Sequence, residues 1–296
     1  MCRNGTLLHT VLLWLGCMGM VLPAHAQDMQ FGLEESGQTA PAGPPAGGPP
    51  SEALGNALRL YTQERYQEAA VQFQRVVEGE TPDAPANVQK AQFFLGKSLY
   101  HLHYYQSALA VFDEVSEQGR AHTFFDQTLQ WLAQLASQLP EPAGIIDKIG
   151  RFGVEQLDQF NNPENADLYN QLLYFMGRSK YNQGEFDKAI ELFGKVDKEN
   201  KWYVKARFFT GISYVRMRKA QPAAAAFRDI IAALDEGDIE GVDEPERMKD
   251  LAWISLARVY YTAANRTTPE GERKVDGVLL GNAVEAWTKL EPESEY

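Results

Sequence analysis

A spacing that recurs along the chain constrains its fold more than any other feature of the sequence. A small residue is followed after 12 positions by an alanine, after four more by an aromatic residue, and after three more by an aliphatic one. Copies beginning at Gly177 and Gly211 are offset by 34 residues. The four full copies are Ala57, Ala69, Phe73, Val76; Gly96, Ala108, Phe112, Val115; Gly177, Ala189, Phe193, Val196; and Gly211, Ala223, Phe227, Ile230.

The chemistry of these positions predicts pairs of packed helices. Small residues on two successive helices let the helix backbones approach closely. The aromatic and aliphatic residues, three positions apart on one helix face, then fill the groove between neighbouring pairs. A fifth copy, Ala257, Ala283, Trp287 and Leu290, has 14 additional residues between its first two members. The sequence therefore predicts helical hairpins joined in series, with an insertion in the last one.

A 34-residue period with this pattern resembles the tetratricopeptide repeat. Residues 95–100 and 186–193 match the two helices of that repeat. The resemblance implies an all-α, right-handed superhelical solenoid of helix hairpins over residues 51–296.

We expect about six hairpins, of which the third is degenerate. Residues 124–139 predict a first helix, but residues 144–157 lack the alanine and phenylalanine of the repeat. A solenoid usually ends in a polar capping helix, and no further repeat follows Leu290. We therefore expect the solenoid to be truncated or uncapped at its C-terminal end: either the natural protein continues, or Trp287 and Leu290 leave an apolar end for another chain.

The N-terminus predicts export. A basic residue at Arg3 precedes an apolar run over residues 7–22, and residues 23–26 place small residues where a signal peptidase reads them. We interpret residues 1–26 as a bacterial signal peptide, which gives a periplasmic mature chain that begins at Gln27 and has no transmembrane helix. Because Leu15 and Gly16 precede Cys17 as in a partial lipobox, an outer-membrane lipoprotein anchored at Cys17 is the alternative.

Residues 27–50 separate this signal from the repeats. Residues 41–50 contain five prolines and three glycines, which cannot maintain a helix or a sheet ladder. The segment is predicted to be a disordered Pro/Gly-rich linker.

Composition narrows the possible functions. With 28 Lys and Arg against 40 Asp and Glu, the formal net charge is −12, which argues against nucleic acid as a partner. The only cysteines, Cys2 and Cys17, lie in the predicted signal peptide. The histidines of the mature chain are His101, His103 and His122. His101 and His103 are two positions apart, a spacing that does not place them together on one helix face. We expect no catalytic, cofactor-binding or metal-binding residues.

In the tetratricopeptide repeat, the first helix of each hairpin lines a concave groove. If the resemblance holds, positions three before, one after and four after the small residue face this groove. The candidate partner-binding residues are Tyr61, Phe93, Lys97, Tyr100, Tyr174, Arg178, Tyr181, Phe208, Arg258 and Tyr261. In three hairpins a cation precedes a tyrosine by three positions, so the two share a helix face. The alternative is that the tyrosines only pack between hairpins.

A groove of tyrosines and cations favours a protein or peptide partner, and the cations suit an anionic segment. The repeats and the export signal are similar to tetratricopeptide proteins and lipoproteins of Gram-negative envelope machines. The predicted function is therefore a non-catalytic protein-interaction scaffold in a bacterial envelope complex. The alternative is the helical superhelix module of a larger envelope enzyme, such as a lytic transglycosylase.

Overall fold

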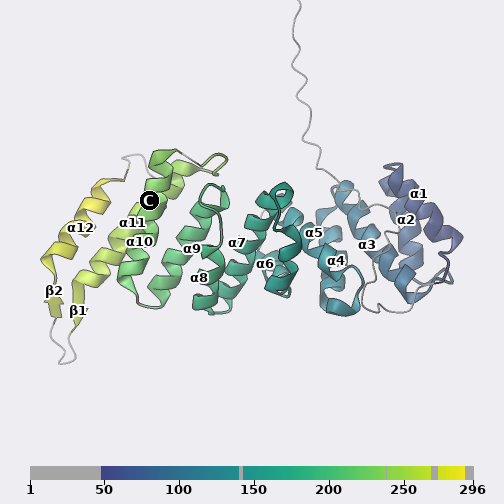
Figure 1. Cartoon of the computed structure of the whole chain (residues 1–296), viewed down its shortest axis with the longest axis horizontal. Helices are drawn as coiled ribbons and strands as arrows, with labels where there is room; N and C mark the ends of the chain where they lie inside the picture. Colours follow the sequence, from purple (N-terminus) through teal and green to yellow (C-terminus); the bar gives the residue numbers. More distant parts are fainter. Residues whose placement is uncertain (1–47, 140–142, 238, 268–272, 291–296) are drawn as a thin grey trace, which may run out of the picture. The chain divides into compact units, whose positions relative to one another are not determined.

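The computed structural model describes residues 48–139, 143–237, 239–267 and 273–290 (Figure 1). The predicted signal peptide, Cys17 and residues 27–47 of the predicted linker lie outside these ranges. Within the described residues, α-helices follow one another in pairs. The pairs are α1 (Glu52–Thr62) with α2 (Tyr66–Val77), α3 (Pro85–His101) with α4 (Tyr105–Gln118), α5 (Phe125–Gln138) with α6 (Ala143–Ile149), α7 (Ala166–Asn182) with α8 (Phe186–Gly194), α9 (Trp202–Arg216) with α10 (Ala220–Glu236), and α11 (Pro245–Ala264) with α12 (Gly277–Thr288).

The pairs stack in sequence order. The second helix of each pair packs against the first helix of the next, and successive first helices also contact one another, from α1 against α3 to α9 against α11. The first helices therefore form a continuous layer along the stack (Figure 1). The predicted all-α solenoid of tetratricopeptide-type hairpins is confirmed.

Four hairpins share one turn geometry. The residue after the first helix's cap is left-handed in each, with φ values of 59° at Glu64, 61° at His103, 79° at Gly184 and 59° at Arg218. The next backbone N–H donates back into the helix, as from Arg65 to the Leu60 carbonyl at 3.0 Å. This is a Schellman arrangement, which satisfies carbonyls that the helix end would otherwise leave unpaired.

The repeat positions form the core. In the four full copies the alanine, aromatic and aliphatic residues are at most 4% exposed. The aromatic residue also packs against the following hairpin: the ring centroids are 5.9 Å apart for Phe73 and Phe94, and 6.0 Å apart for Phe112 and Trp131. The spacing seen in the sequence therefore corresponds to contacts both within and between hairpins.

The third hairpin has a different construction. Its second helix, α6, ends at Ile149, and irregular backbone with a 3-10 turn over residues 154–156 replaces the remainder of the predicted helical segment 144–157. A second 3-10 turn follows over residues 158–160. Isoleucines and phenylalanines fill the space instead; Phe152, for example, stacks on Phe125 with centroids 4.2 Å apart. Ion pairs also connect this hairpin to the one before it, because both Lys148 and Arg151 pair with Asp113 of α4.

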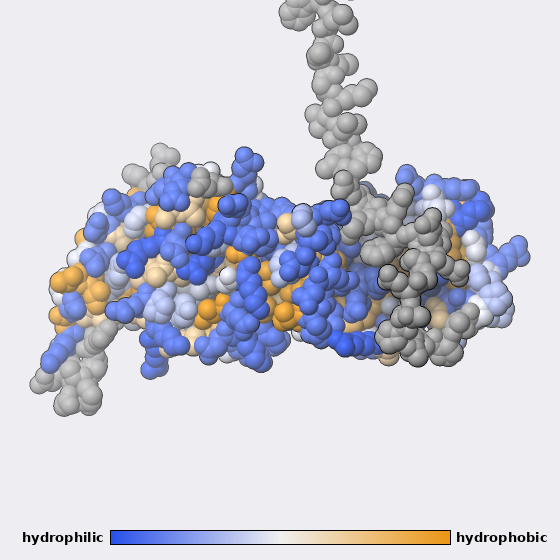
Figure 2. All heavy atoms as spheres, viewed as in Figure 1, coloured by the Kyte–Doolittle hydropathy of each residue, from blue (hydrophilic) through white to orange (hydrophobic). Residues whose placement is uncertain are grey.

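The 14 inserted residues of the last copy extend α11 and form a short antiparallel ladder. Strands β1 (Asn265–Thr267) and β2 (Arg273–Val275) pair with Asn265 opposite Val275. Unlike the aromatic residues of the other copies, Trp287 is 57% exposed. No helix of the described residues follows α12 to cover it. An apolar patch is visible over α12 in Figure 2. Val284 of α12 is also 59% exposed.

Candidate binding groove

The predicted groove residues lie along the layer of first helices, but their exposure differs along the chain. At the N-terminal end, the Tyr61 side chain is 8% exposed and packs edge-on against Phe94, with centroids 5.0 Å apart. The Lys97 ammonium lies 5.0 Å from the Tyr61 ring centroid and 5.0 Å from that of Trp131. Such cation–ring contacts are attractive because the ring face carries negative charge density. This end of the layer is a closed aromatic cluster.

Tyr100 belongs to the same cluster. Its ring is half-buried and meets Trp131 edge-on, with centroids 5.2 Å apart. Burial, together with the neighbouring Tyr105, raises the pKa of the Tyr100 hydroxyl. Phe93 is buried too and stacks on Phe124 at 4.8 Å. These side chains pack between neighbouring hairpins.

In the middle of the chain, Tyr174 and Arg178 of α7 face α9. Tyr174 is 5% exposed and stacks on Trp202, with centroids 5.2 Å apart. The Arg178 guanidinium carbon lies 3.8 Å from the Phe209 centroid, and its Nη1 donates to the Tyr174 hydroxyl at 2.9 Å. Tyr181 is half-buried and meets Phe209 edge-on at 5.4 Å. The cation of this hairpin therefore contacts Phe209 and Tyr174, rather than the tyrosine three positions after it.

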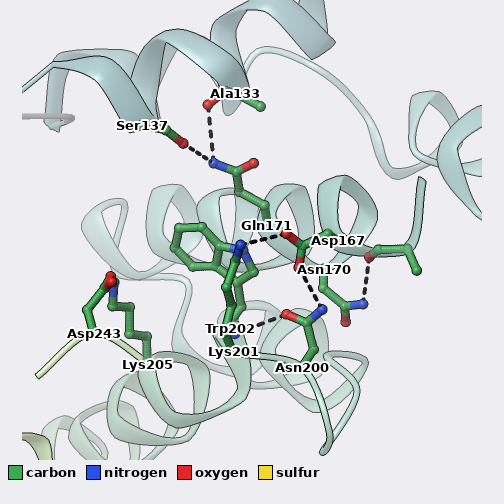
Figure 3. Close-up of polar contacts among 11 residues, drawn as sticks. Ala133, Ser137, Asp167, Asn170, Gln171, Asn200, Lys201, Trp202, Lys205 and Asp243 are labelled. Carbon is green, nitrogen blue, oxygen red and sulfur yellow. Dashed lines mark hydrogen bonds and ion pairs between the residues drawn. The ribbon is translucent and has the colours of Figure 1, made fainter. Parts of the chain in front are cut away.

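Beside these residues lies a cavity of about 600 Å³, open to solvent on one side and lined by α5, α6, α7, α9 and the segment before α11. Apolar and aromatic side chains form part of its wall, and three cations, Arg178, Lys201 and Lys205, line it as well. Lys201 pairs with Asp167 at 2.6 Å and Lys205 with Asp243 at 2.6 Å, as Figure 3 shows. We call this the α7–α9 cavity.

Hydrogen bonds hold the wall of the α7–α9 cavity. The Gln171 amide donates to the Ala133 carbonyl at 3.2 Å and to the Ser137 hydroxyl at 2.8 Å, joining α7 to α5 (Figure 3). The hydrogen bond from Lys205, together with the charges of Lys205 and Lys201, keeps the pKa of Asp243 below its usual value. Asp243 is therefore ionised at neutral pH and fixes the position of Lys205.

A larger and more apolar groove is lined by α9, α10, α11 and α12. Its volume is about 1200 Å³. Its apolar and aromatic lining residues are Phe208, Ile212, Val215, Ala220, Phe227, Leu251, Ile254, Val259, Ala263 and Trp287. The charged residues that line it are Arg218, Lys219 and Arg258, all exposed cations, with no carboxylate among the lining residues. We call this the C-terminal groove.

The C-terminal groove includes two of the residues predicted from the sequence, Phe208 and Arg258. Tyr261 is 55% exposed on the same helix as Arg258 but is not among the lining residues. Arg218 and Lys219, which the sequence analysis did not single out, lie in the turn between α9 and α10. Turn residues have no place in a pattern of helix faces, so only the folded structure brings these cations to the groove.

The sequence analysis also missed the lysines of the α7–α9 cavity. Lys201 and Lys205 are four positions apart around Trp202, at the start of α9. Residues four apart share a helix face. This spacing of two lysines around a tryptophan is therefore the feature of the sequence that could have predicted a cationic site here.

The histidines have structural surroundings. His101 stacks on Tyr66, with ring centroids 4.3 Å apart, and His122 is 1% exposed. Burial lowers the pKa of His122 to about 4. Within the described ranges, no group of three or more His, Cys, Asp or Glu residues is arranged to hold a metal ion. No helix in the part that the structure describes is long and apolar enough to cross a membrane.

No protein-family model matches this chain, and a search of curated proteins finds no significant match. Solved structures do match. BtubC (BKLC) from P. vanneervenii aligns over 82% of this chain and 94% of its own, at 14% identity and a TM-score of 0.39.

Two further matches have lower scores. A kinesin light chain from Podosopora anserina with nearly identical TPR-like repeats aligns over 81% of this chain and 96% of its own, at 12% identity and a TM-score of 0.29. The TPR2AB domain of yeast Sti1, in a complex with pHSP90, aligns over 79% of this chain and 89% of its own, at 11% identity and a TM-score of 0.27. The hairpins of the chain itself, with their repeated turns and small–aromatic contacts, identify the fold as a tetratricopeptide-repeat solenoid.

Proposed function

We propose that this protein is a non-catalytic scaffold that binds a partner protein through a short segment carrying both carboxylates and apolar side chains. The observation that carries the proposal is the C-terminal groove. Most of its lining residues are apolar, and its charged lining residues are Arg218, Lys219 and Arg258, in a chain whose formal net charge is −12. Apolar grooves with a few placed charges are typical binding sites, and complementary charge selects the partner.

The groove is also available to a ligand. Among the described residues, no ion pair involves Arg258 or Arg218, and Trp287, which lines the same groove, is 57% exposed. Arginine and tryptophan contribute more binding energy at protein interfaces than most residue types. A segment with an acidic residue next to an aromatic or aliphatic one would satisfy both.

A selection from a random peptide library tests the proposal. We expect the mature chain to enrich peptides that combine acidic and apolar residues. Arg258→Glu should weaken binding of the selected peptides by about 1–3 kcal/mol, as expected for an interface hot spot. Arg228→Glu on α10 is the matched control, because Arg228 is exposed, has the same charge and does not line the groove. Enrichment of basic peptides, or equal effects of both variants, would exclude the C-terminal groove.

We further propose that the scaffold acts in the bacterial cell envelope. The predicted signal peptide, residues 1–26, supports this location. Intact-mass measurement of the exported protein should give a chain that begins at Gln27. A chain that begins at Cys17 and carries acyl groups would instead support an outer-membrane lipoprotein.

A further inference from the structure

The α7–α9 cavity contains an arginine without a counter-ion. Among the described residues, Lys201 and Lys205 each contact a carboxylate, whereas none lies within ion-pair distance of Arg178. Aromatic rings and one neutral hydroxyl surround the guanidinium instead, and its Nε is buried without a hydrogen-bond partner in the described residues. Arg178 is half-buried, with its Nε out of contact with water, and partly buried charges are normally paired, so this arrangement leaves a place for an anion.

The neighbouring lysines indicate which anion the cavity suits. Asp167 and Asp243 place their carboxylates on Lys201 and Lys205, each with an N–O distance of 2.6 Å. These cationic side chains therefore already bind carboxylates of the chain itself. A planar guanidinium is well matched to a carboxylate, because two parallel N–H groups can donate to its two oxygens.

The rest of the wall indicates what the carboxylate is attached to. Tyr174, Phe175 and Trp202 contribute rings, and Ile146 and Leu139 contribute aliphatic surface. The indole Nε1 of Trp202 is buried and has no hydrogen-bond partner among the described residues. The volume of about 600 Å³ is in the usual range for a small organic ligand.

We propose that the α7–α9 cavity binds a small organic carboxylate with an aromatic or aliphatic body, and that Arg178 receives the carboxylate. This site is separate from the C-terminal groove. The two share no lining residue. The proposal therefore stands or fails independently of the peptide-binding function.

Nuclear magnetic resonance of protein labelled with ¹⁵N-tryptophan tests the site directly. The indole signal of Trp202, assigned with Trp202→Phe, lies in the cavity wall and reports on binding there. The probes are N-acetyl-phenylalanine, indole-3-acetate and hexanoate. Each is titrated to about 10 mM, so that even weak, millimolar binding is detected. We expect at least one acid to shift the Trp202 signal saturably.

Two comparisons isolate the role of Arg178. The uncharged N-acetyl-phenylalaninamide should bind at least about tenfold more weakly than the acid, the loss expected for one charge-assisted hydrogen bond. Arg178→Gln should weaken binding of the acid by a similar factor. Arg178→Lys keeps the charge but not the planar guanidinium, so its affinity should lie between those of the wild type and Arg178→Gln. Arg258→Gln, outside the cavity, should have no effect. Circular dichroism of each variant checks that the helices are intact.

The possible outcomes decide the proposal. A longer peptide that ends in phenylalanine distinguishes a chain terminus from a free small acid, and both would support a carboxylate site. If inorganic phosphate bound as well as the acids, the cavity would be a general anion site and the proposed ligand class would be wrong. Equal binding of acid and amide, acid binding unchanged in Arg178→Gln and Arg178→Lys, or no binding by any of the three acids would overturn the proposal.

Discussion

Gly177 of α7 lies directly against the ring of Phe193 in α8. A Cβ atom placed on Gly177 would come 2.5 Å from Cε1 of Phe193, closer than atoms of two side chains can approach. The same relationship joins Gly96 to Phe112, at 2.7 Å, and Gly211 to Phe227, at 2.6 Å. Three hairpins therefore close around one contact between a glycine and a phenylalanine 16 positions later.

Substitution of this glycine should destabilise the fold. The methyl group of Gly177→Ala would force the buried Phe193 ring to move, and overpacking of this kind typically costs about 1–3 kcal/mol. Gly55→Ala is the control, because Gly55 is in the exposed part of α1 and has no atom within 4 Å of the added methyl group. Alanine there should stabilise α1 by about 0.5–1 kcal/mol. Urea denaturation gives both values, and similar changes for the two variants would contradict the proposed contact.

Loss of the aromatic residue should have a larger effect. Phe193 is 1% exposed and contacts both its own hairpin and, through Phe209 at 6.1 Å, the next one. Phe193→Ala should lower the free energy of unfolding by about 3–5 kcal/mol. Because each repeat contacts only its neighbours, we also expect the unfolding transition to separate into two steps. Unchanged denaturation curves would mean that the repeat register is wrong.

The repeat positions were predictable because they are periodic. Gly211, Ala223 and Phe227 keep the spacing of Gly177, Ala189 and Phe193, and this spacing is enough to predict the hairpins and the fold class. The segment of the third hairpin that follows Ile149 was not predictable in detail. There α6 ends at Ile149 and irregular turns bury Phe152 and Phe160, an arrangement without a period.

The site was predictable only in part, for a related reason. Periodicity places Lys97, Arg178 and Arg258 on one face of the first helices, but it does not show what covers them. Trp131 and Phe209, which lie outside the small–alanine–aromatic–aliphatic positions, pack over Lys97 and Arg178. Arg258 remains exposed in the C-terminal groove.

The stability of the fold should depend on pH through His122. This side chain is 1% exposed; its Nδ1 accepts a hydrogen bond from the Phe124 N–H at 3.1 Å, and its Nε2 is buried without a partner in the described residues. Burial lowers its pKa from 6.5 to about 4. Between these values the unfolded chain binds more protons than the folded one, so acid favours unfolding.

Stability from His122 should therefore be complete above about pH 6.5 and decline toward pH 4, by up to about 3 kcal/mol. Denaturation of the wild type and of His122→Phe across this range measures the effect. The variant, which cannot be protonated, should show a shallower decline. Parallel curves for the two proteins would show that His122 does not cause the pH dependence.

The ion pairs of Asp113 should stabilise the third hairpin. Burial alone would raise the pKa of Asp113, but hydrogen bonds and charge from Lys148 and Arg151 keep it below its usual value. Asp113→Asn would leave both cations without this partner, and we expect a loss of about 1–3 kcal/mol at pH 7. Glu199→Gln, at an exposed position, is the control. The difference between the two variants should disappear at low pH, where Asp113 is protonated.

Trp287 should affect binding far more than stability. It occupies the aromatic position of the last repeat copy, but it is 57% exposed and lines the C-terminal groove, whereas Phe193 at the equivalent position is buried. Trp287→Ala should therefore lower the free energy of unfolding by at most about 1 kcal/mol, as surface substitutions do. It should weaken binding of a library-selected peptide by about 1–3 kcal/mol, because tryptophan is a frequent hot spot. Val284→Ala, also exposed on α12 but outside the groove lining, should change neither value.

Fluorescence anisotropy and urea denaturation measure the two effects separately. A stability loss as large as that of Phe193→Ala would place Trp287 in the core, and unchanged peptide affinity would exclude it from the binding surface.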